Sequence, residues 1–149
     1  TELDDPTQDS LVRVSISVND PLGEPKYYRY FTRVNSEPFF APLFGSVAND
    51  GAVDGESFDF PINRAFGRIN RDSITNRTQF FERGDTVAVK LCAIEKDVFD
   101  FWTTLEDDLR NQGSPFGSAT VIQSNVEGGL GVFAGYSCDV DSVIIPEKQ

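Results

Sequence analysis

The residues of this chain that could carry out chemistry are mainly carboxylates, because the sequence contains 24 Asp and Glu residues and no histidine. Without an imidazole, the catalytic arrangements that depend on one are excluded. These include Ser/His/Asp and Cys/His sites and the common histidine-bound zinc sites of hydrolases. Acid–base chemistry by carboxylates remains open, and no motif in the sequence indicates a cofactor.

Oxygen ligands gather in one glycine-rich segment, residues 49–56, with the sequence NDGAVDGE. Asp50, Asp54 and Glu56 carry carboxylates of the kind that Ca²⁺ prefers. The EF-hand spacing and its bidentate glutamate are missing, so we favour a solvated turn over a calcium site. The same residues are the candidates for acid–base roles in a carboxylate-based hydrolase, which ranks last among the functions considered.

The two cysteines, Cys92 and Cys138, lie in separate segments with strand character. In an oxidising compartment they could form a disulfide, and in a reducing one they would be buried thiols. The sequence does not show whether their Cβ atoms meet, so both alternatives stay open. A nucleophilic cysteine would need a cationic or basic neighbour, and Cys138 is flanked by Ser137 and Asp139.

Aromatic side chains are concentrated between residues 27 and 44. Within Lys26 to Val34 they alternate onto both faces of a strand, so a single core cannot hold all of them. We favour a two-sided sandwich core covered by the adjoining loop, with an exposed patch for a partner or ligand as the alternative. The candidate binding residues are Tyr27, Tyr28, Tyr30, Phe39, Phe40 and Phe44.

The segment Glu127 to Tyr136, EGGLGVFAGY, has the composition of a nucleotide-binding glycine loop. It lacks the lysine of a P-loop and leads into an aromatic strand rather than a helix, so nothing in it is placed to cradle phosphate. We interpret its glycines as positions that permit a bulge or a close backbone approach. We therefore expect this segment to offer few side chains to a partner.

Length and charge limit the class of protein. A chain of 149 residues with a net charge of −11 fits one acidic domain. The negative charge would repel phosphate backbones and anionic headgroups, so we expect no nucleic acid partner. No apolar run reaches the roughly 20 residues that span a bilayer, and the opening TELDDPTQDS has no signal-peptide pattern.

Short alternating segments separated by turn residues predict a mainly β fold. Leu11 to Val18 and Lys26 to Val34 predict a hairpin around a turn at residues 19–23, and residues 36–55 predict an irregular loop. Further strands are expected at residues 57–62, 74–81, 85–94, 120–126, 131–138 and 141–145. We expect an antiparallel β-sandwich, immunoglobulin-like or related.

One amphipathic helix is predicted near residues 97–111. Its apolar residues recur at spacings of three and four and form one stripe, made of Val98, Phe101, Trp102, Leu105 and Leu109. Asp97 is expected to cap the first turn, and Arg110 is favourable in the last. We expect this helix to pack on a sheet face or to close one end of the sandwich.

Several motifs resemble those of a known family. They are GDTVAV from Gly84, FDFWTTL in the predicted helix, GSPF at residues 113–116, and SNVEGGLGVFAGY ending at Tyr136. A looser match is DPLGEPKYYR, from Asp20 to Arg29. The series resembles the C-terminal half of domain of unknown function 4249, a family of Bacteroidetes surface lipoproteins encoded beside TonB-dependent outer-membrane receptors.

The resemblance implies a cellular setting rather than a chemistry. It implies that residues 1–149 form one domain in the C-terminal portion of a longer exported lipoprotein. A lipid anchor on an upstream part, absent from this chain, would hold it at the outer membrane or cell surface. We therefore expect a non-enzymatic accessory or ligand-capture domain that works with a TonB-dependent receptor. The alternative is an independent carbohydrate- or peptide-binding sandwich module.

Overall fold

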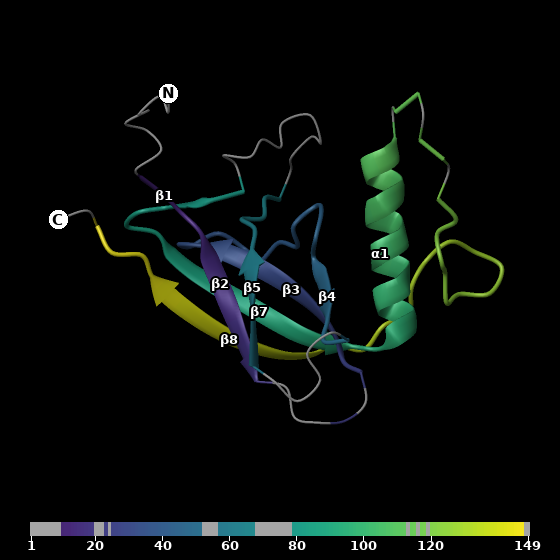
Figure 1. The fold of residues 1–149 in the computed structure, drawn as a ribbon, viewed down its shortest axis with the longest axis horizontal. Coiled ribbons are helices and arrows are strands. Elements are labelled where there is room, and N and C mark those ends of the chain that lie inside the picture. Colours follow the sequence, from purple (N-terminus) through teal and green to yellow (C-terminus); the bar gives the residue numbers. More distant parts are fainter. Residues whose placement is uncertain are drawn as a thin grey trace.

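The computed structural model describes residues 10–19, 23, 25–51, 57–67, 79–112, 114–115, 117–118 and 120–147. Within these residues the fold is mainly β, with antiparallel sheets and one helix, as the sequence predicts (Figure 1). No helix in this part of the chain has the length and apolar character of a transmembrane span.

The largest sheet has four strands in the order β4-β3-β7-β8. Its members are β3 (Tyr27–Val34), β4 (Val47–Asn49), β7 (Thr86–Ile94) and β8 (Ser137–Ile144), and all neighbours are antiparallel. Valine and isoleucine are frequent in β7, where their branched side chains favour extended backbone. β3 and β7 pair along their whole length and form the centre of the fold.

Two smaller sheets complete the β structure. β2 (Val14–Asn19) pairs with β5 (Ser57–Ile62), and β1 (Leu11–Val12) pairs with β6 (Phe81–Glu82). The main core cluster consists of Tyr30, Val34, Ile62, Phe81, Val87 and Ile145, with Val14, Ile16 and Phe60 packed against it. Because these side chains come from both β2–β5 and β3–β7, the two sheets face each other across the core in a sandwich.

The predicted hairpin is wrong in its pairing. β3 forms within one residue of its expected bounds, whereas the strand predicted from Leu11 to Val18 is divided at Arg13 into β1 and β2. β2 pairs with β5, and β3 pairs with β4 and β7. The physical reason is burial: Val14 and Ile16 on β2 pack across the sandwich onto the sheet that contains Tyr30. The strands therefore bury their apolar faces against each other instead of sharing a ladder.

The helix α1 (Lys96–Asn111) matches its prediction to within one residue, and Val98 and Phe101 of its stripe are buried. It stands beside the four-stranded sheet near β3 and β4, where it makes its sheet contacts (Figure 1). The expected cap is wrong, because the N-cap is Glu95 and makes no side-chain capping bond. Asp97 lies inside the first turn, where its Oδ1 accepts the Val98 N–H at 2.8 Å.

The strands predicted between residues 120 and 145 differ from the structure. Residues 120–126 and 131–136 are not strands, and the last strand, β8, covers residues 137–144 as one element. The segment from 120 to 136 runs along α1, away from any free strand edge, so it has no ladder partner (Figure 1). The strand expected at 74–81 lies mostly outside the described residues.

Candidate functional site

The four-stranded sheet has an inner face toward the core and an outer face. Register places residues that pair directly on the same face. The outer-face residues of β3 are Tyr27, Arg29, Phe31 and Arg33, and those of β7 are Ala88, Lys90, Cys92 and Ile94. On β8 they are Cys138, Val140, Ser142 and Ile144. None of these side chains is acidic, although the chain carries a net charge of −11.

Cations and aromatic rings alternate along this face. The Arg33 guanidinium lies 4.6 Å from the centre of the Phe39 ring, and the Lys90 ammonium lies 5.0 Å from the same ring. Lys90 is also 4.7 Å from Phe31, whose ring lies 5.2 Å from the Arg29 guanidinium. We call Arg29, Phe31, Arg33, Phe39 and Lys90 the cation–aromatic face. Each contact lies within the distance at which a ring attracts a cation.

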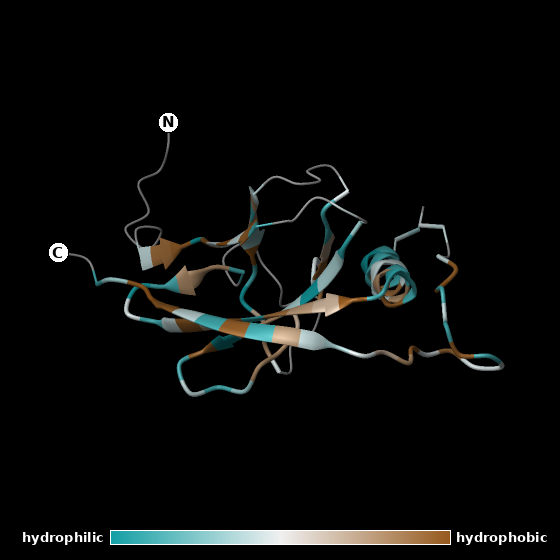
Figure 2. Cartoon of the chain, turned by 90° about the horizontal axis from the view of Figure 1, so that it is seen from below, coloured by the Kyte–Doolittle hydropathy of each residue, from teal (hydrophilic) through white to brown (hydrophobic). Residues whose placement is uncertain are grey.

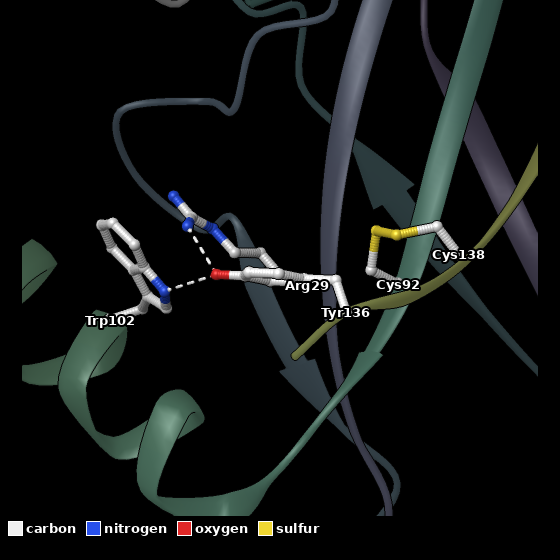
Figure 3. The surroundings of a disulfide bond; sticks show 5 residues. All are labelled: Arg29, Cys92, Trp102, Tyr136 and Cys138. Carbon is white, nitrogen blue, oxygen red and sulfur yellow. Dashed lines mark hydrogen bonds between the residues drawn. A yellow bond between two sulfur atoms is a disulfide. The ribbon is translucent and has the colours of Figure 1, made fainter. Parts of the chain in front are cut away.

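At its Arg29 end, this face packs against a cluster of side chains from β3, α1 and the segment before β8. The Arg29 guanidinium lies 3.3 Å above the Trp102 ring, and both side chains donate hydrogen bonds to the Tyr136 hydroxyl, at 3.3 and 3.1 Å (Figure 3). Burial lowers the pKa of Arg29, while its hydrogen bond to Tyr136 opposes that effect. The cluster fixes Arg29 in place.

Glu106 provides the counter-charge beneath this cluster. Its carboxylate is 7% exposed and accepts the backbone N–H groups of Gly45 and Ser46, at 2.6 and 3.2 Å. The Ser46 hydroxyl donates to Glu106 and accepts a bond from the Arg29 Nε at 3.4 Å. Ser46 therefore connects the buried cation to the buried anion, and Glu106 ties α1 to the segment that leads into β4.

The outer part of the face keeps its positive charge. Ion pairs of the described residues join Arg64 to Glu37, Lys96 to Asp100 and Arg110 to Asp107. In this part of the chain no carboxylate forms an ion pair with Arg33 or Lys90. An unneutralised pair of cations flanked by rings can attract an anionic group and pack its apolar parts at the same time.

The predicted aromatic candidates fall into two groups. Tyr28 and Tyr30 are buried, at 9% and 2% exposure, and burial raises the pKa of Tyr30 to about 12. Tyr27 packs on Phe99 of α1, Phe40 bridges to Thr32, and Phe44 lies under Arg110. Phe39 is the candidate that belongs to the cation–aromatic face. Ligand binding by the 27–44 segment stays a prediction. Within that segment, the aromatic side chains on this face are Phe31 and Phe39, and both are partly exposed.

The candidate calcium ligands are only partly described. Asp50 is 2% exposed, and its two carboxylate oxygens accept the Lys26 N–H at 2.8 and 2.9 Å. This arrangement joins the ends of β3 and β4. Asp54 and Glu56 lie outside the described residues. No group of carboxylates within the described ranges has the arrangement of a metal site.

Cys92 and Cys138 are joined by a disulfide between the paired strands β7 and β8 (Figure 3). The two residues are directly opposite in the ladder, with their Cα atoms 4.0 Å apart. The bond therefore ties the last strand to the centre of the sheet. While the bond is intact, neither sulfur is a thiol, so neither can act as a thiolate nucleophile.

The glycine-rich segment differs from the expectation that it offers few side chains. Ser124 and Asn125 brace it, because the Ser124 hydroxyl bonds to the backbone of Gly131 and Asn125 bonds to that of Phe133. Asn125 also donates to Asp97 of α1 at 2.6 Å. Leu130 and Phe133 are 70% and 85% exposed. A Cβ at Gly128 or Gly129 would meet nothing within 4 Å, so close approach does not explain these glycines.

Sequence reasoning missed that Arg29, Arg33 and Lys90 share one face of the sheet. The signal was present in the strand YYRYFTRV, where cations and one ring alternate with residues that face the core. Lys90 could be placed on the same face only with the register of β7 against β3, which the sequence does not contain. The bracing by Ser124 and Asn125 has no comparable sequence signal.

The fold is an antiparallel β-sandwich whose larger sheet carries the cation–aromatic face on its outer side. Residues 1–141 match the family model described as Domain of unknown function (DUF4249), and the chain belongs to this family. The match covers more of the chain than the dense motifs between Gly84 and Tyr136. No curated protein and no solved structure matches the chain significantly.

Proposed function

We propose that this chain is a non-enzymatic ligand-capture domain that serves a TonB-dependent receptor at the cell surface. The observation that carries the binding role is the cation–aromatic face, where Arg33 and Lys90 keep their charge beside Phe31 and Phe39. Cations steer and hold an anionic group, and ring faces supply apolar contact area. The ligand class that fits this face is an acidic glycan or an acidic peptide.

The cellular setting rests on two supports of different kinds. The Cys92–Cys138 disulfide favours an exported protein, because disulfides persist in oxidising compartments. The receptor partner comes from the family resemblance. A surface for docking on a receptor is available in the braced segment from Ser124 to Phe133, where Leu130 and Phe133 present apolar side chains to solvent.

Ligand capture is tested with acidic and neutral glycan and peptide arrays. We expect binding to acidic members that weakens as salt is raised and is lost in the double variant Arg33→Gln/Lys90→Gln. The matched control is Lys96→Gln/Arg110→Gln, which removes the same charge from α1. Equal binding by both double variants would remove the face from the proposal.

Receptor docking is tested separately by affinity capture from solubilised native outer membrane. We expect a TonB-dependent receptor to be recovered with the unaltered chain and to be lost with Leu130→Ser/Phe133→Ser. Both side chains are exposed, so this variant should keep its fold. Ligand binding without any recovered receptor would instead favour the independent carbohydrate- or peptide-binding module.

A further inference from the structure

A groove of about 430 Å³ lies between the two sheets on the side of β8. Its walls include the consecutive residues 14–17 of β2 and 139–143 of β8. Side chains of consecutive strand residues point to opposite faces, so strand edges rather than one face form these walls. The floor is apolar and consists of Val87, Val89 and Leu91 of β7.

β8 is the outermost strand of its sheet, and all of its residues are exposed. It lies uncovered along the near side of the molecule in Figure 2, with polar and apolar residues alternating along it. This eight-residue edge contains no lysine and no proline, two residues that commonly block strand addition. Its charged residues are Asp139 and Asp141 on the inner side, and the Asp141 carboxylate accepts the outward N–H of Ser142 at 2.7 Å.

The hydrogen-bond pattern shows which backbone groups of β8 point outward. The Tyr30 N–H donates to the Ser46 carbonyl, away from β7. The backbone N–H and C=O groups of consecutive strand residues point to alternate sides of the strand. Because those of Tyr30 point away from β7, those of its partner Leu91 point toward Asp139 on β8. Val140 follows Asp139, so its backbone groups point away from β7. Val140 therefore offers an N–H and a C=O to an incoming strand, and its own side chain is 56% exposed.

A strand added to this edge would place every second side chain over the groove. Apolar side chains suit the floor of Val87, Val89 and Leu91. Asp139 and Asp141 share the inner side of β8 with Val143 and line the groove. These carboxylates favour a strand that also carries basic residues.

We propose that the free edge of β8 and the groove beside it bind an extended basic peptide strand with alternating apolar residues. The site is separate from the cation–aromatic face and prefers the opposite ligand charge. A second copy of this chain is disfavoured, because each copy carries a net charge of −11 and would bring another Asp139 and Asp141 to the edge.

The probe is a fluorescein-labelled eight-residue peptide of alternating valine and lysine, measured by fluorescence polarisation at physiological salt. We expect saturable binding, and at least tenfold weaker binding of the alternating valine and glutamate peptide. Val140→Pro should weaken binding at least tenfold, because it removes an outward N–H and no bond of the β7–β8 ladder. Circular dichroism and thermal melting check that this variant keeps its fold.

Charge reversal gives a second test that does not depend on proline. Asp139→Lys/Asp141→Lys should weaken binding of the valine and lysine peptide at least tenfold. The control Asp107→Lys/Asp108→Lys makes the same charge change on α1 and should leave binding within twofold. Absence of saturable binding, or equal loss in both charge variants, would overturn the proposal. So would a peptide-independent dimer, lost in Val140→Pro, because it would assign the edge to a second copy.

Discussion

Replacement of Trp102 by alanine tests the cluster that fixes Arg29. The Arg29 guanidinium lies over the Trp102 ring with its Cζ 3.3 Å from the ring centre, a contact worth about 2 kcal/mol when desolvated. The indole N–H donates to Tyr136 at 3.1 Å, which contributes about 1 kcal/mol. The edge contact with Phe101 adds about 1 kcal/mol. We therefore expect Trp102→Ala to lower the free energy of unfolding by about 3–5 kcal/mol.

Chemical and thermal unfolding of the oxidised chain measure this effect. For a chain of this length, a loss of about 4 kcal/mol corresponds to a fall in Tm of roughly 8–16 °C. Trp102→Phe keeps a ring beneath Arg29 and removes the donor to Tyr136, so it should lose only about 1–2 kcal/mol. A loss below about 1 kcal/mol for Trp102→Ala would show that the ring does not stabilise this cluster and would leave it free for a ligand.

Three further predictions concern buried polar groups. Glu106→Ala should lower the free energy of unfolding by about 3–5 kcal/mol, because Ser46 loses a buried acceptor and Arg29 loses a counter-charge. A loss as small as that for a surface carboxylate, measured by denaturant unfolding, would contradict this. The folded-state pKa of Tyr30 is raised from 10.0 to about 12, so its neutral phenol stabilises the fold fully below pH 10. This stabilisation should decline as pH rises through 12, and spectrophotometric titration should find a late-titrating phenol that Tyr30→Phe removes. Calorimetric titration should show no Ca²⁺ site with a dissociation constant below ~10⁻⁴ M, because Asp50 already accepts the Lys26 N–H. Micromolar Ca²⁺ binding that is lost in Asp54→Ala would overturn this prediction.

Local periodicity predicted the elements well where each one is regular. The bounds of β5, β7 and α1 lie within one residue of those expected from alternation and from spacings of three and four. Strand partners could not be predicted in the same way, because β2 and β5 pair across a long stretch of chain. Alternation near residue 120 had no strand edge to meet, so the segment there became a braced loop instead.

The candidate site was predictable only in outline. The aromatic segment was recognised, but the strand that contains it turns Tyr28 and Tyr30 into the fold and Arg29, Phe31 and Arg33 outward. Which side faces the core depends on the sheet packed against it, and that is a long-range property. The disulfide likewise depended on the register that places Cys92 opposite Cys138.

The function proposed for the cation–aromatic face is that Arg33 and Lys90 bind an anionic ligand there. Isothermal titration calorimetry with a galacturonate tetramer and its neutral methyl ester tests it most directly, since the two probes differ only in having a carboxylate or a methyl ester at each sugar. We expect the acidic tetramer to bind more tightly than its ester, and we expect this binding to weaken as salt is raised. Arg33→Gln/Lys90→Gln should abolish the difference between the two probes, and Lys96→Gln/Arg110→Gln should keep it. Hexaglutamate and hexaglutamine serve as the acidic and neutral peptide probes. If neither the acidic tetramer nor hexaglutamate binds better than its neutral counterpart, Arg33 and Lys90 do not bind an anionic ligand.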